Sequence, residues 1–453
     1  MRDMAKEEIK SLDKEHVLHS WSVQGTLDPM VVTKAEGIYF YDADGNKYYD
    51  MSSQLVNLNI GYNYVVGANI AGFEKVADAI AEQAHKLPFI GPGYAVDVKS
   101  ELARKIIELA PDNMGKVFFT LGGADANENA LKIARLYTGR NKVFSRYRSY
   151  HGSTMGAGNL TGEPRRFNCE TNGVSGYIKF FDPYIYREPI EFKSEAEATK
   201  YYLAKLREQI IYENPETVAA IECETITGSN GCIIPPDGYL QGIRDICDEF
   251  GIMMICDEVM MGWGRTGEYF AFQNWDVKPD LVSFAKGVTC GYAPLGGVIV
   301  SKKIAEYFDD HKLLCGLTYS GHPLSCAAGV ATLDVYKEEK LVENSKAMGK
   351  ILGEILEELK RKHPCVGDVR YKGLFSALEL VKDKATKEPL VEYNSDPDNT
   401  MGKIIGSLKK KGFSTYSHEN CIIVAPPLII KEDELRAAMD IMDEVLGEVD
   451  KMI

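Results

Sequence analysis

The chain has 453 residues, of which 45% are hydrophobic and 26% charged, so it is long enough for two or three structural units with ample core. Its formal net charge of −14 argues against a nucleic-acid binder and against a surface made for anionic membranes. No run of ~18 apolar residues predicts a membrane span, and residues 1–10 lack the apolar run of a signal peptide.

The ten cysteines are scattered and none forms a C-x-x-C pair. Several lie inside apolar runs, where a reduced core thiol is the usual state. The eight histidines show no H-E-x-x-H spacing. We therefore expect a cytoplasmic protein with reduced thiols and no metal site.

The N-terminal region predicts a helix, then an irregular arm that contains Trp21, then a hairpin. The hairpin strands at 37–41 and 47–49 flank Asp44-Gly45, a strong turn signal. Residues 66–110 are predicted to be mainly helical, because apolar residues recur there at helical spacing. The hairpin precedes the next domain and is expected to join the C-terminal one.

From residue 117 onward short apolar runs alternate with helical stretches, which is typical of an α/β domain with a mostly parallel sheet. After about residue 330 the pattern changes to a smaller α+β unit, with helices expected at 341–362, 402–411 and 432–449 and strands at 374–381 and 421–424. We predict three segments: an arm and hairpin at 1–64 that belong to the small domain, a large domain at 65–329, and the small domain at 330–453.

Two of the apolar runs end on charged residues. The run at 252–256 is followed by Asp257, and the run at 281–285 is followed by Lys286. Charged residues at the carboxyl ends of buried parallel strands lie where open α/β sheets bind ligands. An amine that must be uncharged to act, close to a buried acid, indicates Schiff-base chemistry.

Two glycine-rich segments could bind phosphate. Residues 122–125, Gly-Gly-Ala-Asp, lie between a strand and a helix, and they form either a phosphate-binding turn or a plain tight turn. Residues 262–267 match G-x-G-x-x-G, but a dinucleotide site needs a strand directly before the motif and a helix directly after it. Neither is expected here, so we disfavour NAD binding.

Each candidate also has a plain structural alternative: a solvated lysine, a helix-capping acid, or a core tyrosine at position 150. Their order along the chain is more informative than any one of them. That order resembles the class III (ω-amino acid) aminotransferases, pyridoxal-phosphate enzymes of fold type I. The resemblance covers nearly the whole chain, and its matching segments are 37–45, 123–128, 150–152, 257–259, 264–267, 285–287 and 425–428.

The resemblance implies a large α/β domain, a smaller α+β domain, and a homodimer that shares its active sites. It also implies pyridoxal 5'-phosphate as the cofactor, with an amine donor and a 2-oxo acid as substrates. Lys286 would bond to the cofactor aldehyde and later move a proton, while Asp257 would pair with the pyridine nitrogen. The other cofactor-binding residues it implies are Gly123 and Ala124 at the phosphate, Tyr150 and Val259 on the two ring faces, Glu224, and Thr318 at the neighbouring subunit's cofactor.

This chain departs from the family at several positions. Many members have Gln at the position of Met260, where it contacts the ring hydroxyl. Arginines that bind substrate anions or pair with the family glutamate in other members are replaced by Ser153, Tyr416 and Ile423. Three common ways of binding an anion are therefore missing.

Residues 19–24 and 52–57 look most like taurine aminotransferases. Taurine has a sulfonate and no α-carboxylate, so an α-amino acid clamp is not needed. Trp21 could line the substrate pocket or pack within the N-terminal arm. Arg165 could contact a substrate anion or lie on the surface. The other candidate substrate contacts are Gln54 and Tyr416.

The sequence therefore predicts a ping-pong transfer of the amino group from taurine to a 2-oxo acid, which gives sulfoacetaldehyde. We favour 2-oxoglutarate as the acceptor, with pyruvate next. Two alternatives stay open. One is a transaminase for β-alanine, 4-aminobutyrate or a diamine, or an aminomutase; the other is a non-catalytic or NAD-binding α/β protein.

Overall fold

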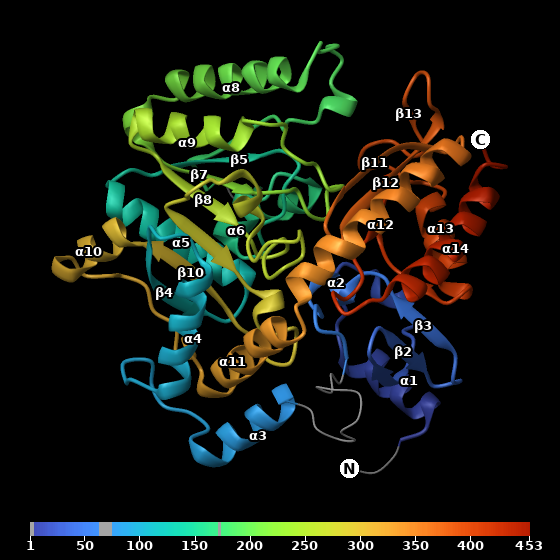
Figure 1. Ribbon diagram of the computed structural model, residues 1–453, viewed down its shortest axis with the longest axis horizontal. Coiled ribbons are helices and arrows are strands. Elements are labelled where there is room, and N and C mark those ends of the chain that lie inside the picture. Colours follow the sequence, from blue (N-terminus) through green and yellow to red (C-terminus); the bar gives the residue numbers. More distant parts are fainter. Residues whose placement is uncertain (1–3, 63–74, 171–173) are drawn as a thin grey trace.

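The computed structural model describes residues 4–62, 75–170 and 174–453. These residues form a large α/β domain with a smaller α+β domain beside it (Figure 1). The predicted boundary at 64/65 and residues 66–74 of the predicted helical region lie outside the described residues. The boundary at 329/330 falls within α11 (Pro323–Glu338), and we keep the three-part division as a proposal.

The large domain is built on a seven-stranded sheet in the order β4-β10-β9-β8-β7-β5-β6. The sheet is mostly parallel, as predicted, but β10 runs antiparallel to both β4 and β9. Every residue of β7 to β10 is buried, which explains their continuous apolar character. The strands are β4 (Met114–Thr120), β5 (Lys142–Arg146), β6 (Tyr177–Phe180), β7 (Val218–Glu224), β8 (Met253–Asp257), β9 (Leu281–Phe284) and β10 (Gly296–Ser301).

Helices cover both faces of this sheet. Met253 and Ile255 of β8 pack with α5 (Gly123–Thr138), whereas Met254 and Cys256 pack in the cluster that holds α9 (Tyr239–Phe250). Alternate residues of one strand thus face opposite layers. The remaining helices of this domain are α3 (Lys75–Lys86), α4 (Asp97–Leu109), α6 (Met155–Leu160), α7 (Phe167–Glu170), α8 (Glu195–Tyr212), α10 (Lys302–Asp310) and α11.

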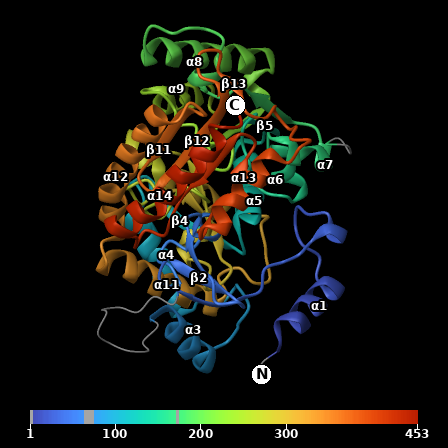
Figure 2. The same cartoon turned by 90° about the vertical axis from the view of Figure 1, so that its right-hand side faces the viewer.

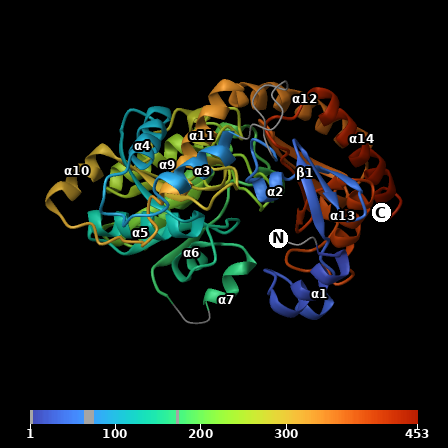
Figure 3. The ribbon, with the colours of Figure 1, turned by 90° about the horizontal axis from the view of Figure 1, so that it is seen from below.

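The smaller domain combines both ends of the chain. Its first sheet, β1-β2-β3-β14, pairs β3 (Lys47–Asp50) with β14 (Phe413–Ser414), so a strand of the N-terminal hairpin lies next to a strand from the C-terminal part of the chain. Its second sheet is antiparallel, and α12, α13 and α14 pack outside the strands (Figure 2, Figure 3). The other elements are α1 (Lys6–His16), α2 (Ser53–Val56), β1 (Val32–Glu36), β2 (Tyr39–Asp42), β11 (Val366–Lys372), β12 (Phe375–Asp383), β13 (Glu388–Pro389), β15 (Ser417–His418), β16 (Cys421–Val424), α12 (Leu341–Lys362), α13 (Thr400–Lys410) and α14 (Glu432–Val449).

Residues 262–267, which match the dinucleotide motif G-x-G-x-x-G, lie in the connection between β8 and β9. Its arginine, Arg265, is fully buried, and its guanidinium donates hydrogen bonds to four acceptors in distant parts of the chain. These acceptors are Ser53 Oγ, Asn59 Oδ1 and the carbonyl oxygens of Leu374 and Pro426. The segment thus joins the two domains and is not followed by a helix of the kind a dinucleotide site requires.

All ten cysteines are free thiols. No helix in the described part of the chain combines the length and the apolar character that crossing a membrane requires. The sheet order places β9, β8 and β7 side by side, and they end at Phe284, Asp257 and Glu224. The carboxyl ends of these strands therefore bring together Lys286, Asp257 and Glu224, and α5 begins at the same end of the sheet.

Candidate active site

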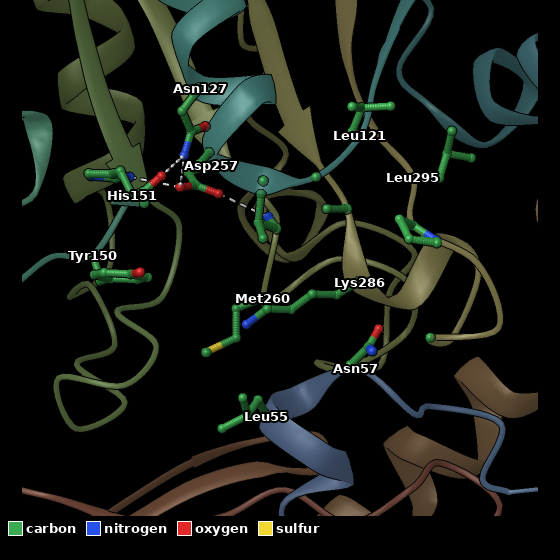
Figure 4. A pocket seen from close by; sticks show the side chains of 18 of the residues that line it. Leu55, Asn57, Leu121, Asn127, Tyr150, His151, Asp257, Met260, Lys286 and Leu295 are labelled. Atoms are coloured by element: carbon green, nitrogen blue, oxygen red, sulfur yellow. Dashed lines mark hydrogen bonds and ion pairs between the residues drawn. The ribbon is translucent and has the colours of Figure 1, made fainter. Parts of the chain in front are cut away.

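A cavity of about 450 Å³ lies at this edge of the sheet (Figure 4). Among the described residues that line it, Lys286 is the one lysine or arginine. The cavity brings together the predicted residues Gln54, Gly123, Ala124, Tyr150, Glu224, Asp257, Val259 and Lys286.

Asp257 is held as a buried hydrogen-bond acceptor. Oδ2 accepts from Nδ2 of Asn127 at 2.8 Å and lies 2.7 Å from Nδ1 of His151, while Oδ1 accepts from the N–H of Val259 at 3.0 Å. Figure 4 shows the three polar side chains converging above the cavity. Three interactions fix the carboxylate, which can present negative charge to a cationic group in the cavity.

Asn127 and His151 were not among the predicted site residues. Both lie inside segments that carry the family resemblance, at 123–128 and 150–152, and that membership is the signal that could have identified them. A third residue, Glu222, is fully buried on β7 and has no hydrogen-bond partner in the described part of the chain. Burial raises the pKa of Glu222 well above its usual range, and the nearby Asp257 adds to this effect. The protonated form of Glu222 is therefore favoured beside Asp257.

Lys286 begins a short 3₁₀ turn directly after β9. Its φ is +47°, a left-handed conformation that is uncommon for residues other than glycine. Burial lowers the pKa of its amine to about 8, although Asp257 and Glu224 act in the opposite direction. A neutral amine is consequently abundant near physiological pH, which is the state a nucleophile needs.

The pKa of Lys286 gives a pH prediction. If the pyridoxal phosphate implied by the sequence resemblance is added, its uptake should have a rate that rises about tenfold per pH unit and levels off near pH 8, because only a neutral amine attacks an aldehyde. Stopped-flow absorbance across pH 6 to 10 measures this rate. A rate that climbs toward about pH 10.4, as for an ordinary lysine, would contradict the prediction.

The start of α5 provides an anion site. Gly123 and Ala124 line the cavity at the N-terminus of this 16-residue helix, and the capping residue Gly122 has no side chain to occupy the free backbone N–H groups. A Cβ on Gly123 would lie 2.7 Å from Cγ1 of Val259, so only glycine lets the two segments approach this closely.

Glu224 organises the wall between Tyr150 and β7. Its carboxylate accepts from the N–H of Tyr150 at 3.0 Å and from the N–H of Gly228 at 2.7 Å. The two bonds fix the backbone that carries the Tyr150 ring. Among the described residues the Glu224 carboxylate has no ion-pair partner, and Arg146 donates a hydrogen bond to the backbone carbonyl of Glu224.

Four predicted residues lie outside the cavity lining. Thr318 is on the exposed surface, where this chain's own cavity does not reach it. Tyr416 is partly buried and, like Met260, packs against the buried cluster that contains Ile423. Trp21 is 61% exposed, and the guanidinium of Arg165 is close to the rings of both Trp21 and Tyr150.

Comparisons with known proteins agree with this arrangement. Residues 21–446 match the family described as aminotransferase class III. The chain is 32% identical to taurine–pyruvate aminotransferase of Bilophila wadsworthia over 98% of this chain and 97% of that protein. It is 33% identical to putrescine–pyruvate aminotransferase of Pseudomonas aeruginosa over 94% and 93% of the two chains.

One solved structure is more similar still: taurine:2-oxoglutarate aminotransferase from Bifidobacterium kashiwanohense, in complex with pyridoxal phosphate and glutamate. It has 49% identity and a TM-score of 0.95, and it covers 100% of this chain and 99% of that one. Fold and site together define a pyridoxal-phosphate-dependent enzyme of fold type I. More specifically, the chain belongs to the class III aminotransferases.

The described residues fit the cofactor of this family. Pyridoxal phosphate has an anionic phosphate, a basic ring nitrogen and an aldehyde. The cavity offers free N–H groups at the start of α5, the buried carboxylate of Asp257, and an amine on Lys286 whose pKa is lowered to about 8. Each chemical feature of the cofactor therefore has a complementary group.

Proposed function

We propose that the chain transfers the amino group of taurine to a 2-oxo acid, with 2-oxoglutarate favoured over pyruvate, and releases sulfoacetaldehyde. The observation that carries the proposal is the composition of the cavity: among the described residues that line it, no arginine stands beside Lys286 to bind the α-carboxylate of an amino donor. Taurine has no such group. The similarity to taurine:2-oxoglutarate aminotransferase of Bifidobacterium kashiwanohense supports both the donor and the acceptor.

The roles of the residues follow from their positions. Gly123 and Ala124 would hold the phosphate, and Asp257 would keep the ring nitrogen protonated. When bound, pyridoxal phosphate acts as an electron sink for negative charge on the carbon that carries nitrogen. Lys286 would remove the proton from that carbon and return it to the cofactor.

Tyr150 and Val259 would pack against the two faces of the cofactor ring. Glu224 would hold Tyr150 in place by accepting a hydrogen bond from its backbone N–H. The exposed Thr318 would reach the cofactor of the neighbouring subunit, so we propose a homodimer with shared active sites. Gln54, Trp21, Tyr416 and Arg165 are proposed to surround the substrate. The cytoplasmic location stays a prediction from the sequence.

A half-reaction screen tests the donor. The cofactor-loaded enzyme is mixed separately with taurine, β-alanine, 4-aminobutyrate, putrescine and alanine, and the visible absorbance of the bound cofactor is followed. Taurine should remove the band fastest at equal concentration. If taurine leaves the band unchanged while another amine removes it, the proposed donor is wrong.

The acceptor is tested in the reverse direction. The enzyme first converted by its amine donor is mixed with 2-oxoglutarate or pyruvate, and recovery of the band is measured. Faster recovery with 2-oxoglutarate is expected. Recovery with pyruvate alone would overturn this part of the proposal and leave the donor assignment intact.

A further inference from the structure

A buried acid lies behind the active site, on the strand next to the one that ends at Asp257. Glu222 belongs to β7, which pairs in parallel with β8. Its side chain is fully buried, and it is not among the residues that line the cavity. Acidic side chains are almost never fully buried unless a partner compensates them. The surroundings of Glu222 therefore need an explanation that its strand position alone does not supply.

Three titratable side chains meet at this place, and we call them the Glu222 cluster. A carboxylate oxygen of Glu222, a ring nitrogen of His151 and a carboxylate oxygen of Asp257 all lie within 4.8 Å of one another. Nδ1 of His151 is 2.7 Å from Oδ2 of Asp257, and the same oxygen accepts from the amide of Asn127. Because Oδ2 is already occupied by two hydrogen-bonding groups, a proton suits this cluster better than a metal ion.

Two members of the Glu222 cluster have unused hydrogen-bonding capacity. In the part of the chain that the structure describes, neither carboxylate oxygen of Glu222 has a hydrogen-bond partner, and Nε2 of His151 has none either. A hydrogen lies between Nδ1 of His151 and Oδ2 of Asp257, since two bare lone pairs would repel at 2.7 Å. With Nδ1 as the donor, Nε2 of a neutral ring is an acceptor. A protonated carboxyl group is the donor that Nε2 lacks.

The groups around Glu222 favour a proton on it. Burial raises the pKa of Glu222 well above its usual range, and the negative charges of Asp257 on β8 and Glu128 on α5 raise it further. Arg135 of α5 acts in the opposite direction. Tyr177 of β6 also faces Glu222, and burial raises the pKa of its hydroxyl, so it adds no charge at neutral pH. Negative neighbours thus outnumber the one positive neighbour.

We propose that Glu222 is a positioning residue for the reaction: it holds a proton and donates it in a hydrogen bond, directly or through one buried water, to the ring of His151. The hydrogen bond made by one ring nitrogen sets the state of the other, so His151 keeps its Nδ1–H on Asp257. Asp257 then stays ionised opposite the ring nitrogen of the cofactor. The inference rests on the role of Asp257 in the proposed function and is independent of the identity of the amine donor.

A carboxyl group offers something here that an amide or a hydroxyl does not. Its proton can stay on Glu222 or move to His151, and the Glu222 cluster carries one net negative charge in both arrangements. That charge matches the single positive charge of a protonated pyridine ring. Buried charges are tolerated when they are paired and hydrogen-bonded, so the shared proton keeps the charge behind the cofactor balanced.

Infrared spectroscopy of the cofactor-free chain tests the proton on Glu222. A protonated carboxyl group has a C=O stretch that an ionised carboxylate lacks. The difference spectrum between wild type and Glu222→Gln separates this band from that of other buried acids such as Glu258, whose pKa burial raises to about 7. We expect the band in wild type at pH 7 and its loss in Glu222→Gln. If the two spectra agree at this frequency, Glu222 is ionised and the proposal is overturned, whichever amine the enzyme uses.

Two substitutions separate hydrogen-bond donation from packing. Glu222→Gln keeps a donor for His151, whereas Glu222→Leu fills a similar volume without one. In cofactor-free protein labelled with ¹⁵N-histidine, the resonance of the Nδ1 proton of His151 should persist in Glu222→Gln and shift or broaden in Glu222→Leu. With pyridoxal phosphate added, its affinity and the half-reaction rate with the best amine donor should fall about tenfold in Glu222→Leu and stay within about threefold of wild type in Glu222→Gln.

Glu128→Gln is the matched control. Glu128 also acts on Glu222, but its carboxylate accepts from the N–H groups of Gly156 and Ala157 and from the hydroxyl of Thr154. This substitution should leave the infrared band of Glu222 in place. Equal losses in Glu222→Gln and Glu222→Leu would mean that no donor is needed, and a wild-type rate in Glu222→Leu would mean that the acid has no role. Both results overturn the proposal, whereas a failure of taurine as donor leaves the infrared result unchanged.

Discussion

Replacing Lys286 with alanine should lower turnover by about 10⁴-fold, the largest effect expected of any single substitution in this chain. The variant loses both the amine that bonds to the cofactor and the group that moves the proton, and a positioned acid–base group alone contributes about 10² to 10⁴-fold. Single-turnover absorbance measures the rate. Mass spectrometry after borohydride reduction should find the cofactor attached to wild type and not to the variant.

Lys302→Ala is the control for this experiment, because Lys302 is an exposed lysine at the start of α10, outside the cavity. It should retain the wild-type rate and the covalent attachment. Attachment that persists in Lys286→Ala would mean that another lysine holds the cofactor.

Asp257→Asn should give the second-largest loss. The substitution keeps the size of the side chain but removes the negative charge that His151 and Asn127 surround. Breaking a buried charge pair costs about 3 to 5 kcal/mol, which corresponds to about 160- to 5,000-fold in rate when the pair acts in the transition state. The half-reaction rate and the cofactor affinity, from absorbance titration, are the measurements.

Asn127→Ala gives a graded comparison. It removes one donor to Asp257 and leaves the carboxylate charged, so a loss of about tenfold is expected. Thermal melting establishes that both variants are folded. A rate for Asp257→Asn within about threefold of wild type would exclude Asp257 as the partner of the ring nitrogen.

The sequence predicted Asp257 and Lys286 because a charged residue at the end of a buried strand can be recognised from the local sequence pattern alone. β8 and β9 are continuous apolar runs, and the residues after them must lie at the same edge of a parallel sheet. The amphipathic helices could also be predicted from the sequence: the predicted helices at 341–362 and 432–449 coincide with α12 and α14.

Other elements lacked a local signal. α11 is buried on most of its surface, so it has no polar stripe to mark its period. β11 carries polar and charged residues at half of its positions, and it was not predicted. Arg165 and the Asp257–Asn127 bond depend on tertiary approach, since the two bonded residues lie 130 positions apart in sequence. Glu222 is buried and has no hydrogen-bond partner in the part of the chain that the structure describes; acidic residues are seldom buried in this way, so this could not be anticipated.

The buried Arg265 makes the connection beside Lys286 depend on segments that lie far away in the sequence. Its guanidinium donates to acceptors of Ser53, Asn59, Leu374 and Pro426. A buried polar group that loses its hydrogen-bond partners is costly in free energy. A truncation that removes Pro426 should therefore destabilise the β8–β9 connection of the large domain as well as the small domain.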